Sequence, residues 1–259
     1  DQGDILLEGK SIKTVQAAKR AKDIARVFQD PKMGTASRLT IEENMAIAYR
    51  RGLSRGLSWG VKDNERQIFQ ESLKELGLGL ENRLKVDTQF LSGGQRQALT
   101  LLMAALVKPK LLLLDEHTAA LDPKTSDMVM ELTKKIVESH QLTTLMITHN
   151  MENAIAYGNR LVMLHQGRIV VDVKGEEKAN LTVQDLMELF HKNSGQALAN
   201  DELIEIIEFQ DGPSNSRLSG TRFSHQAENF TLINIKGNII NGLFVVFMSI
   251  FSNQRVHLL

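Results

Sequence analysis

The sequence predicts an α/β fold in which a mostly parallel β-sheet is flanked by helices. Leu111–Leu114 is an unbroken apolar run, which is the pattern of a strand buried on both faces of a parallel sheet. Two acidic residues, Asp115 and Glu116, follow this run at the carboxyl end of the strand, where open α/β sheets place their ligands. An amphipathic helix is expected at 126–139 and a further strand at 142–147.

Composition and charge restrict the class of protein. The chain of 259 residues can hold one large domain or two small ones, and its 31 Lys and Arg balance its 31 Asp and Glu. No global electrostatic field therefore points to nucleic acid or to an anionic membrane surface. The absence of cysteine excludes a disulfide framework and thiolate metal sites, in agreement with a reducing cytosol.

Neither a signal segment nor a transmembrane segment is expected. The N-terminus lacks a basic-then-apolar stretch, and no apolar run reaches the roughly 18–20 residues that span a bilayer. The longest candidate, 242–251, is too short and has polar neighbours. The sequence therefore predicts a soluble, cytoplasmic protein that reaches a membrane only by docking to one.

The remaining elements follow from periodicity and from turn residues. Thr40 to Glu43 has the character of a capping box at the start of a mostly helical region that extends to about residue 90. Pro31 disfavours the α conformation of the residue before it, so a loop begins there. The other elements expected are strands at 5–7, 24–28, 161–164 and 168–173, and helices within 11–26, at 63–76, at 151–157 and from Thr182 to about His191.

The segment 91–95, Leu-Ser-Gly-Gly-Gln, precedes an expected helix at 96–107. Ser92 is a suitable N-cap, and Gly93 and Gly94 let a ligand approach the backbone closely. The free N–H groups at such a helix start bind anions. Ser-Gly-Gly alone favours an ordinary capped helix, whereas the complete Leu-Ser-Gly-Gly-Gln with Arg-Gln-Ala-Leu after it favours an anion site.

Four such segments follow one another within about 60 residues, a spacing that one α/β domain can hold together. They are 91–95, 111–116, Leu121-Asp122 and Thr148-His149. In this order they resemble the nucleotide-binding subunit of an ATP-binding-cassette (ABC) transporter. The resemblance implies a P-loop NTPase-like sheet flanked by helices, with an ABC-type helical subdomain at about 40–90 whose surface receives the coupling helix of a permease.

The resemblance also implies a role for each polar residue in these segments. Asp115 would hold Mg²⁺, directly or through water, and Glu116 would polarise the attacking water. His149 would contact the γ-phosphate, and Gln29 would lie at the γ-phosphate, near the Mg²⁺ and the water. The residues implied to bind ATP across a dimer interface are Ser92, Gly93, Gly94, Gln95 and, in the D-loop, Asp122.

Each of these residues also has a plainer interpretation. A lone glutamine before a turn is usually a solvated loop residue, two acids after a strand can cap the next helix, and a lone histidine is usually structural or exposed. The family context favours the functional interpretation. For Gln29 it does so because 39–44 also resembles the family.

One motif of the family is missing. No G-x-x-x-x-G-K-[ST] loop, the nest of backbone N–H groups that holds the phosphates, occurs in the sequence. The aromatic residue that would stack on adenine and the early strands are missing too, and family order places them before Asp1. We therefore expect a partial, N-terminally truncated ABC ATPase domain at 1–200 that does not bind or hydrolyse ATP alone, although its full-length parent does.

The C-terminal part does not match the family. Residues 201–219 are linker-like, and 220–259 hold five of the ten phenylalanines together with few charges. An accessory segment, translation past a frameshift and an amphipathic membrane anchor are three interpretations of 220–259. Among them the frameshift is favoured.

The sequence thus predicts the ATP-hydrolysing, energy-coupling subunit of an ABC transport system, a bacterial importer rather than an exporter. ATP and Mg²⁺ are the expected cofactors. The expected partners are a second nucleotide-binding subunit, as a homodimer, and a permease that holds the chain at the cytoplasmic face of the membrane, with no nucleic acid. The alternatives are a degenerate cassette that acts as a non-catalytic scaffold and a soluble ABC ATPase of DNA repair or translation.

Overall fold

The computed structural model describes residues 3–53, 60–165, 167–194 and 249–251. Its strands are β1 (Leu6–Leu7), β2 (Lys10–Ser11), β3 (Ile24–Val27), β4 (Leu111–Asp115), β5 (Thr144–Ile147), β6 (Arg160–His165), β7 (Arg168–Lys174) and β8 (Ser249–Phe251). Its α-helices are α1 (Ala17–Arg20), α2 (Ile41–Tyr49), α3 (Asp63–Lys74), α4 (Gly93–Leu106), α5 (Pro123–Ser139), α6 (Met151–Ala156), α7 (Gly175–Ala179) and α8 (Val183–Ser194). Short 3₁₀ turns lie at Pro31–Gly34, Leu80–Asn82 and Thr88–Phe90.

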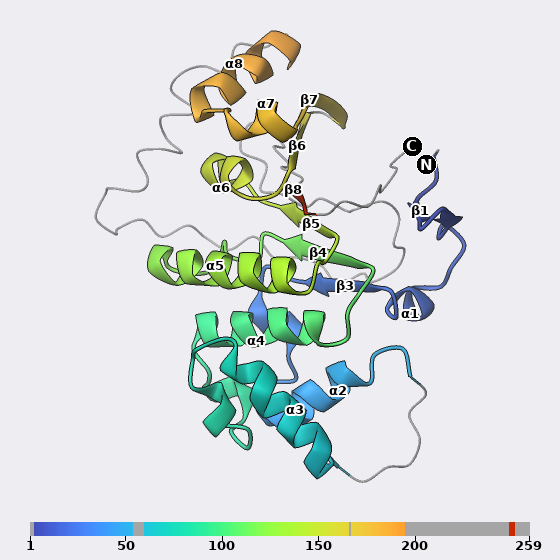
Figure 1. Cartoon of the computed structure of the whole chain (residues 1–259), viewed down its shortest axis with the longest axis vertical. Coiled ribbons are helices and arrows are strands. Elements are labelled where there is room, and N and C mark those ends of the chain that lie inside the picture. Colours follow the sequence, from blue (N-terminus) through green and yellow to red (C-terminus); the bar gives the residue numbers. More distant parts are fainter. Residues whose placement is uncertain (1–2, 54–59, 166, 195–248, 252–259) are drawn as a thin grey trace, which may run out of the picture.

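These elements are stacked around one sheet (Figure 1). α5 and α4 lie on one side of the sheet, and α2 and α3 lie beyond α4, whereas β6, β7 and α6–α8 form the opposite end of the molecule. One hydrophobic core extends from Leu112 of the sheet through α4 to Phe69 of α3. A second cluster, which includes Leu161 and Phe190, joins the β6–β7 hairpin to α8.

Three strands of the central sheet are parallel and end at the same edge. β3 pairs with β4, with Val27 opposite Leu114, and β4 pairs with β5, with Asp115 opposite Ile147. β8 extends the sheet beyond β5 in the antiparallel direction. The predicted mostly parallel sheet flanked by helices is therefore confirmed, and the residues that follow β3, β4 and β5 emerge side by side.

The burial predicted for β4 is only half right. Leu112 and Leu114 are fully buried in the core with α4 and α5, as expected. Leu111 and Leu113 point to the other face and are only partly buried, in a small cluster with Val162 of β6. An unbroken leucine run does not reveal this difference, because the cover of each face comes from distant segments of the chain.

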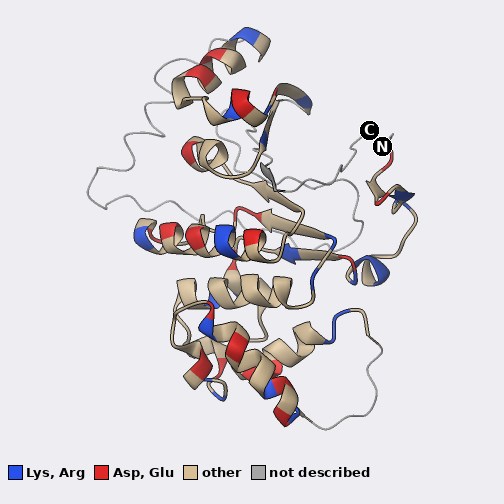
Figure 2. Ribbon diagram, viewed as in Figure 1, with Lys and Arg blue, Asp and Glu red and all other residues tan. Residues whose placement is uncertain are grey.

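α4 occupies the centre of the helical layers. Figure 2 shows that it is almost free of charged residues, whereas α3 and α5 carry many. Its residues from Arg96 to Ala105 are buried, because neighbours pack against it from the sheet side and from α2 and α3. The helix begins as predicted: the Ser92 hydroxyl oxygen accepts a hydrogen bond from the Gln95 backbone N–H at 3.2 Å.

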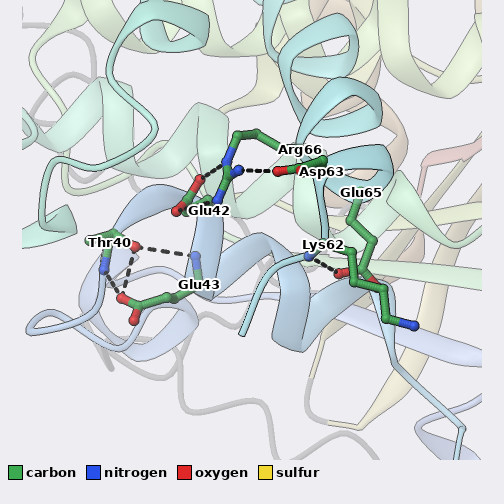
Figure 3. Close-up of polar contacts among 7 residues, drawn as sticks. All are labelled: Thr40, Glu42, Glu43, Lys62, Asp63, Glu65 and Arg66. Atoms are coloured by element: carbon green, nitrogen blue, oxygen red, sulfur yellow. Dashed lines mark hydrogen bonds and ion pairs between the residues drawn. The ribbon is translucent and has the colours of Figure 1, made fainter. Parts of the chain in front are cut away.

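Polar contacts join α2 to α3 (Figure 3). The predicted capping box is present, since the Glu43 N–H donates to Thr40 Oγ1 at 3.3 Å and the Thr40 N–H donates to the Glu43 carboxylate at 2.8 Å. The Arg66 guanidinium of α3 donates to the Glu42 carboxylate of α2 and to Asp63, each at 2.7 Å. Because Glu42 is buried, its carboxylate depends on this arginine, and the contact is one of those that join α2 to α3.

The other predicted elements are present too, whereas β2, α7 and β8 have no counterpart in the prediction. Thr182 caps α8, since its hydroxyl oxygen accepts from the Asp185 N–H at 3.2 Å. Residues 201–219, interpreted as a linker, lie outside the described residues. Of 220–259 the structure describes only the three residues of β8, so the three interpretations of this segment stay untested. Within the described ranges no helix is long and apolar enough to cross a bilayer.

Asn44 ties the loop that follows Gln29 to α2. Its side chain is buried and donates to the carbonyl oxygens of Ala36, Leu39 and Thr40 at 3.1, 3.1 and 3.0 Å. Its amide oxygen accepts from the Ala36 N–H at 2.8 Å. One side chain therefore satisfies several backbone groups of a segment without regular structure.

We expect Asn44→Ala to lower the free energy of unfolding by about 2–3 kcal/mol, because it removes all the hydrogen bonds that this buried side chain makes to the loop. Urea denaturation monitored by circular dichroism measures the change. Asn64→Ala, at an exposed position of α3, is the matched control and should shift the value by less than about 0.5 kcal/mol. Equal effects of the two substitutions would contradict this role for Asn44.

Candidate functional site

The ends of β4 and β5 bring three of the predicted site residues together. Asp115 is the last residue of β4, and the next residue, Glu116, donates its backbone N–H to the Ile147 carbonyl oxygen at 3.0 Å. His149 follows β5, and its Nδ1 lies 3.6 Å from Glu116 Oε1. The carboxylate of Glu116 is partly buried, whereas the His149 ring is largely exposed to solvent. Acid and imidazole groups thus meet at the edge where parallel sheets bind ligands.

The backbone of Glu116 is in the left-handed region, with φ of 44°. A residue with a Cβ atom adopts this conformation at a cost of roughly 1–2 kcal/mol, so its surroundings must enforce it. On one side Ile147 accepts its N–H. On the other side His117 is buried, and its Nε2 lies 2.9 Å from the Thr133 hydroxyl.

The tautomer of His117 follows from the second bond that Thr133 makes. The Thr133 hydroxyl donates to the Val129 carbonyl oxygen at 2.7 Å, so its oxygen accepts from an Nε2–H of His117. Burial lowers the pKa of His117 to about 4, which keeps the ring neutral at physiological pH. His117 is therefore an anchor for the residue before it, and the sequence interpretation did not include it.

Asp115, the predicted Mg²⁺ ligand, is paired with an arginine that the sequence interpretation also missed. The Arg26 guanidinium of β3 donates to the Asp115 carboxylate at 2.5 Å and lies 4.7 Å from the centre of the Phe28 ring. The two residues are 89 positions apart in the sequence, so only the pairing of β3 with β4 reveals the contact. A divalent cation and Arg26 would compete for the same carboxylate.

Gln29 lies two residues beyond the end of β3 and is exposed. The carbonyl oxygen of the residue before it, Phe28, accepts a hydrogen bond from the Gln97 side chain of α4 at 3.1 Å. Gln97 is fully buried, so α4 determines where the Gln29 loop begins. Gln97 could have been suspected from the sequence only because a polar residue stands among the apolar residues of α4.

The predicted ATP-binding segment forms the first turn of α4. The Ser92 N–H donates to the Gln95 side-chain oxygen at 3.2 Å, so these two residues form a reciprocal capping box. Gln95 thus stabilises the helix start itself, while Ser92 and Gly93 are exposed. The first N–H groups of a helix have no acceptor within it, which leaves an anion-binding turn at this position.

Asp122 caps α5 in a similar way. Its carboxylate accepts from the Thr125 N–H at 3.1 Å, and hydrogen bonding from Thr125 lowers the pKa of Asp122. Figure 1 shows that α4 and α5 begin on the side of the molecule to which β3, β4 and β5 point. The predicted residues therefore form two groups on one side, at strand ends and at helix starts, and within the described ranges no hydrogen bond or ion pair joins the groups.

Comparison with known proteins agrees with this arrangement. A family model for ABC transporters matches residues 1–119. The tyrosine transport ATP-binding protein of Clostridioides difficile (strain R20291) is 47% identical over 188 residues, which are 73% of this chain and 74% of that protein. The chain belongs to the ABC transporter family. It is a nucleotide-binding subunit of that family, as its resemblance predicted.

One further relative is similar in sequence, and one solved structure is similar in fold. The phosphate import ATP-binding protein PstB of Campylobacter jejuni is 34% identical over 171 residues, 65% of each chain. A dimeric ATP-binding cassette in a post-hydrolysis state, bound to ADP and Pi, has a TM-score of 0.55 and 28% sequence identity, over 67% of this ABC subunit and 73% of that chain. The predicted P-loop NTPase-like α/β fold is confirmed.

The pairing of His149 with Glu116 has a consequence for titration. The Glu116 carboxylate raises the pKa of His149 above its ordinary 6.5, because it favours the charged imidazole. A raised histidine pKa means that the pair stabilises the fold fully below pH 6.5 and that this contribution is lost as pH rises through the folded-state pKa.

We therefore expect Glu116→Gln to lower the pKa of His149, which NMR titration of the ring protons measures. Glu138→Gln, an exposed change in α5, is the control and should leave the pKa of His149 unchanged. A His149 pKa that is the same with and without the Glu116 carboxylate would contradict the pairing.

Proposed function

We propose that the complete gene product to which this chain belongs hydrolyses ATP as the energy-coupling subunit of an ABC importer. The observation that carries the proposal is the meeting of Glu116 and His149 next to Asp115, with 3.6 Å between the nearest atoms of the first two. Carboxylates and an imidazole at this edge suit a phosphate group, a divalent cation and an attacking water. The relative named for tyrosine transport supports a role in transport, and the relative named for phosphate import supports uptake as its direction.

Glu116 acts on the water. Its carboxylate accepts a hydrogen bond from the attacking water. It takes up a proton of that water as the oxygen bonds to the γ-phosphorus and the bond from the γ-phosphorus to the ADP oxygen breaks. The strained backbone of Glu116, anchored by Ile147 and His117, keeps the carboxylate in one position. His149 donates a hydrogen bond to a γ-phosphate oxygen from the ring nitrogen that does not face Glu116. The exposed amide of Gln29 both accepts and donates, and orients the water.

Asp115 would hold Mg²⁺, which when bound would neutralise charge that develops on the phosphate oxygens. The residue fits this ion, because Mg²⁺ binds through one or two carboxylates together with phosphate oxygens and water. A cage of protein ligands is not required, and the described residues contain no cluster of three or more His, Asp or Glu that could form one. Arg26 would have to release Asp115 before the ion could bind there. The guanidinium of Arg26 would keep its contact with the Phe28 ring.

A second nucleotide-binding subunit, a copy of this one, completes each site. The Ser92 oxygen accepts the Gln95 N–H, so its hydroxyl proton is available to the γ-phosphate of a nucleotide held by the other subunit. The backbone N–H of Gly93, an exposed residue, and the positive end of α4 would add to this attraction. Asp122 is exposed and caps α5, which begins on the same side as α4, and it would cross the interface.

The contact with a permease would hold the subunit at the cytoplasmic face of the membrane. A groove of about 790 Å³ lies between α1 and the end of α2. Ile47 and Leu53 line it with exposed apolar side chains, and Lys19 and Lys22 add positive charge. An amphipathic segment of the permease with acidic residues fits this combination.

ATP hydrolysis by the complete gene product, assembled with its permease, tests the proposal. We expect Glu116→Gln to reduce kcat at least about 100-fold, with a smaller change in KM, because the carboxylate acts mainly in the transition state. Glu138→Gln in α5 is the matched control and should retain the rate. Phosphate release measured against ATP concentration separates kcat from KM.

The same assay distinguishes the scaffold interpretation. The 259 residues contain no G-x-x-x-x-G-K-[ST] loop, which is the observation that favours a non-catalytic cassette. A gene product that assembles with its permease but releases no phosphate, with or without Glu116, would overturn the catalytic proposal in favour of that alternative.

A further inference from the structure

The first turn of α4 contains two glycines whose backbone conformation does not require glycine. Gly93 and Gly94 are helical, and neither has a positive φ. Alanine at such positions would stabilise a helix by up to about 1 kcal/mol each, so glycine must be present for another reason. The sequence suggests close approach of a ligand to both residues, whereas the structure separates them.

The space around the two glycines differs. Gly93 is exposed, and a Cβ atom there would meet only the Leu121 side chain, at 3.4 Å. Gly94 is buried against α5, and a Cβ atom there would lie 2.2 Å from Cγ2 of Thr125. Thr125 is β-branched and stands in the first turn of a helix, so its side chain has few ways to move aside. Gly94 is therefore required by the packing of α4 on α5.

Thr125 also contacts the start of its own helix. Its N–H donates to the Asp122 carboxylate at 3.1 Å, so the residue that touches Gly94 also holds Asp122 in place. Ser92 caps α4 two residues before Gly94. One threonine thus links the exposed hydroxyl implied in phosphate binding to the exposed carboxylate implied in the dimer interface.

We propose that Thr125 is a positioning residue that makes the starts of α4 and α5 one rigid unit. Closure of Ser92 on a nucleotide then carries Asp122 into the interface in the same movement. This inference rests on the proposed function for its nucleotide, whereas the packing of Gly94 on Thr125 does not. Close-packed helix starts of this kind move together because overpacking or loosening either one costs free energy.

The test compares Gly94→Ala with Gly94→Ala combined with Thr125→Ser. Serine removes the Cγ2 methyl group that the new Cβ atom would meet, and it keeps the backbone N–H that Asp122 accepts. We expect Gly94→Ala to raise the ATP concentration for half-maximal dimerisation at least about tenfold, which corresponds to about 1.4 kcal/mol. The double variant should return to within about threefold of the unchanged protein.

The matched control is Gly93→Ala, alone and with Thr125→Ser. Because Gly93 does not touch Thr125, the serine should not rescue any defect of this variant. The measurements are sedimentation of the complete gene product carrying Glu116→Gln, across ATP concentrations, and thermal unfolding without nucleotide. The unfolding temperature should fall with Gly94→Ala and recover in the double variant.

A double variant that dimerises as poorly as Gly94→Ala would overturn the proposal, because Gly94 would then be needed for approach of the ligand. Recovery of the unfolding temperature without recovery of dimerisation would have the same meaning. Failure of the proposed function is distinguishable, since it would appear as an absence of ATP-dependent dimerisation in the parent protein. In that event the unfolding temperatures still decide whether Thr125 packed on Gly94 makes the starts of α4 and α5 one rigid unit. If the unfolding temperature of the double variant does not recover, this packing is refuted.

Discussion

The parallel register of β3, β4 and β5 is the constraint on which the candidate site depends. Val27 lies opposite Leu114, and Asp115 lies opposite Ile147, so three strands from separate parts of the chain end together. Glu116 and His149 are 33 positions apart in the numbering, yet this register places their side chains 3.6 Å apart. A shift of one residue would turn every side chain of a strand to the other face and separate the site.

Two features add to this constraint, one electrostatic and one of packing. Arg26 satisfies the Asp115 carboxylate within the chain, so any divalent cation must replace an existing interaction rather than enter a free site. α4 lies between the sheet and α2 and α3 and carries Ser92 at its start. Because Gln97 of α4 also bonds the Phe28 carbonyl, the Gln29 loop and the Ser92 turn share one rigid helix.

The parts that the sequence predicted well are those with local causes. Ser92 and Thr40 were identified as helix caps because a capping box needs only residues within one turn. Asp115 and Glu116 were placed at a strand end because a leucine run precedes them directly. The domain boundaries and the roles of the site residues stay predictions, since position alone does not test chemistry.

The parts that the sequence did not predict depend on contacts between distant segments. The weaker burial of Leu111 and Leu113 follows from what covers the second face of the sheet. Arg26 had no visible role because its partner is 89 positions away. Gly94, the second glycine of segment 91–95, was predicted to contact a ligand. The structure shows instead that a Cβ atom at this position would lie nearest to Thr125. Local patterns carry no information on such distances.

The central claim is that each catalytic site combines Glu116 of one subunit with Ser92 of another, and mixing two inactive variants tests it most directly. Ser92→Ala loses a helix cap, a cost of about 1 kcal/mol that leaves the fold intact, and Glu116→Gln keeps the shape of the side chain. In a mixed dimer one of the two sites contains neither change. Equal amounts of the two complete gene products should therefore recover about a quarter of the normal ATPase rate, by random pairing in a symmetric dimer. Exchange of subunits without any recovery of activity would contradict the shared site.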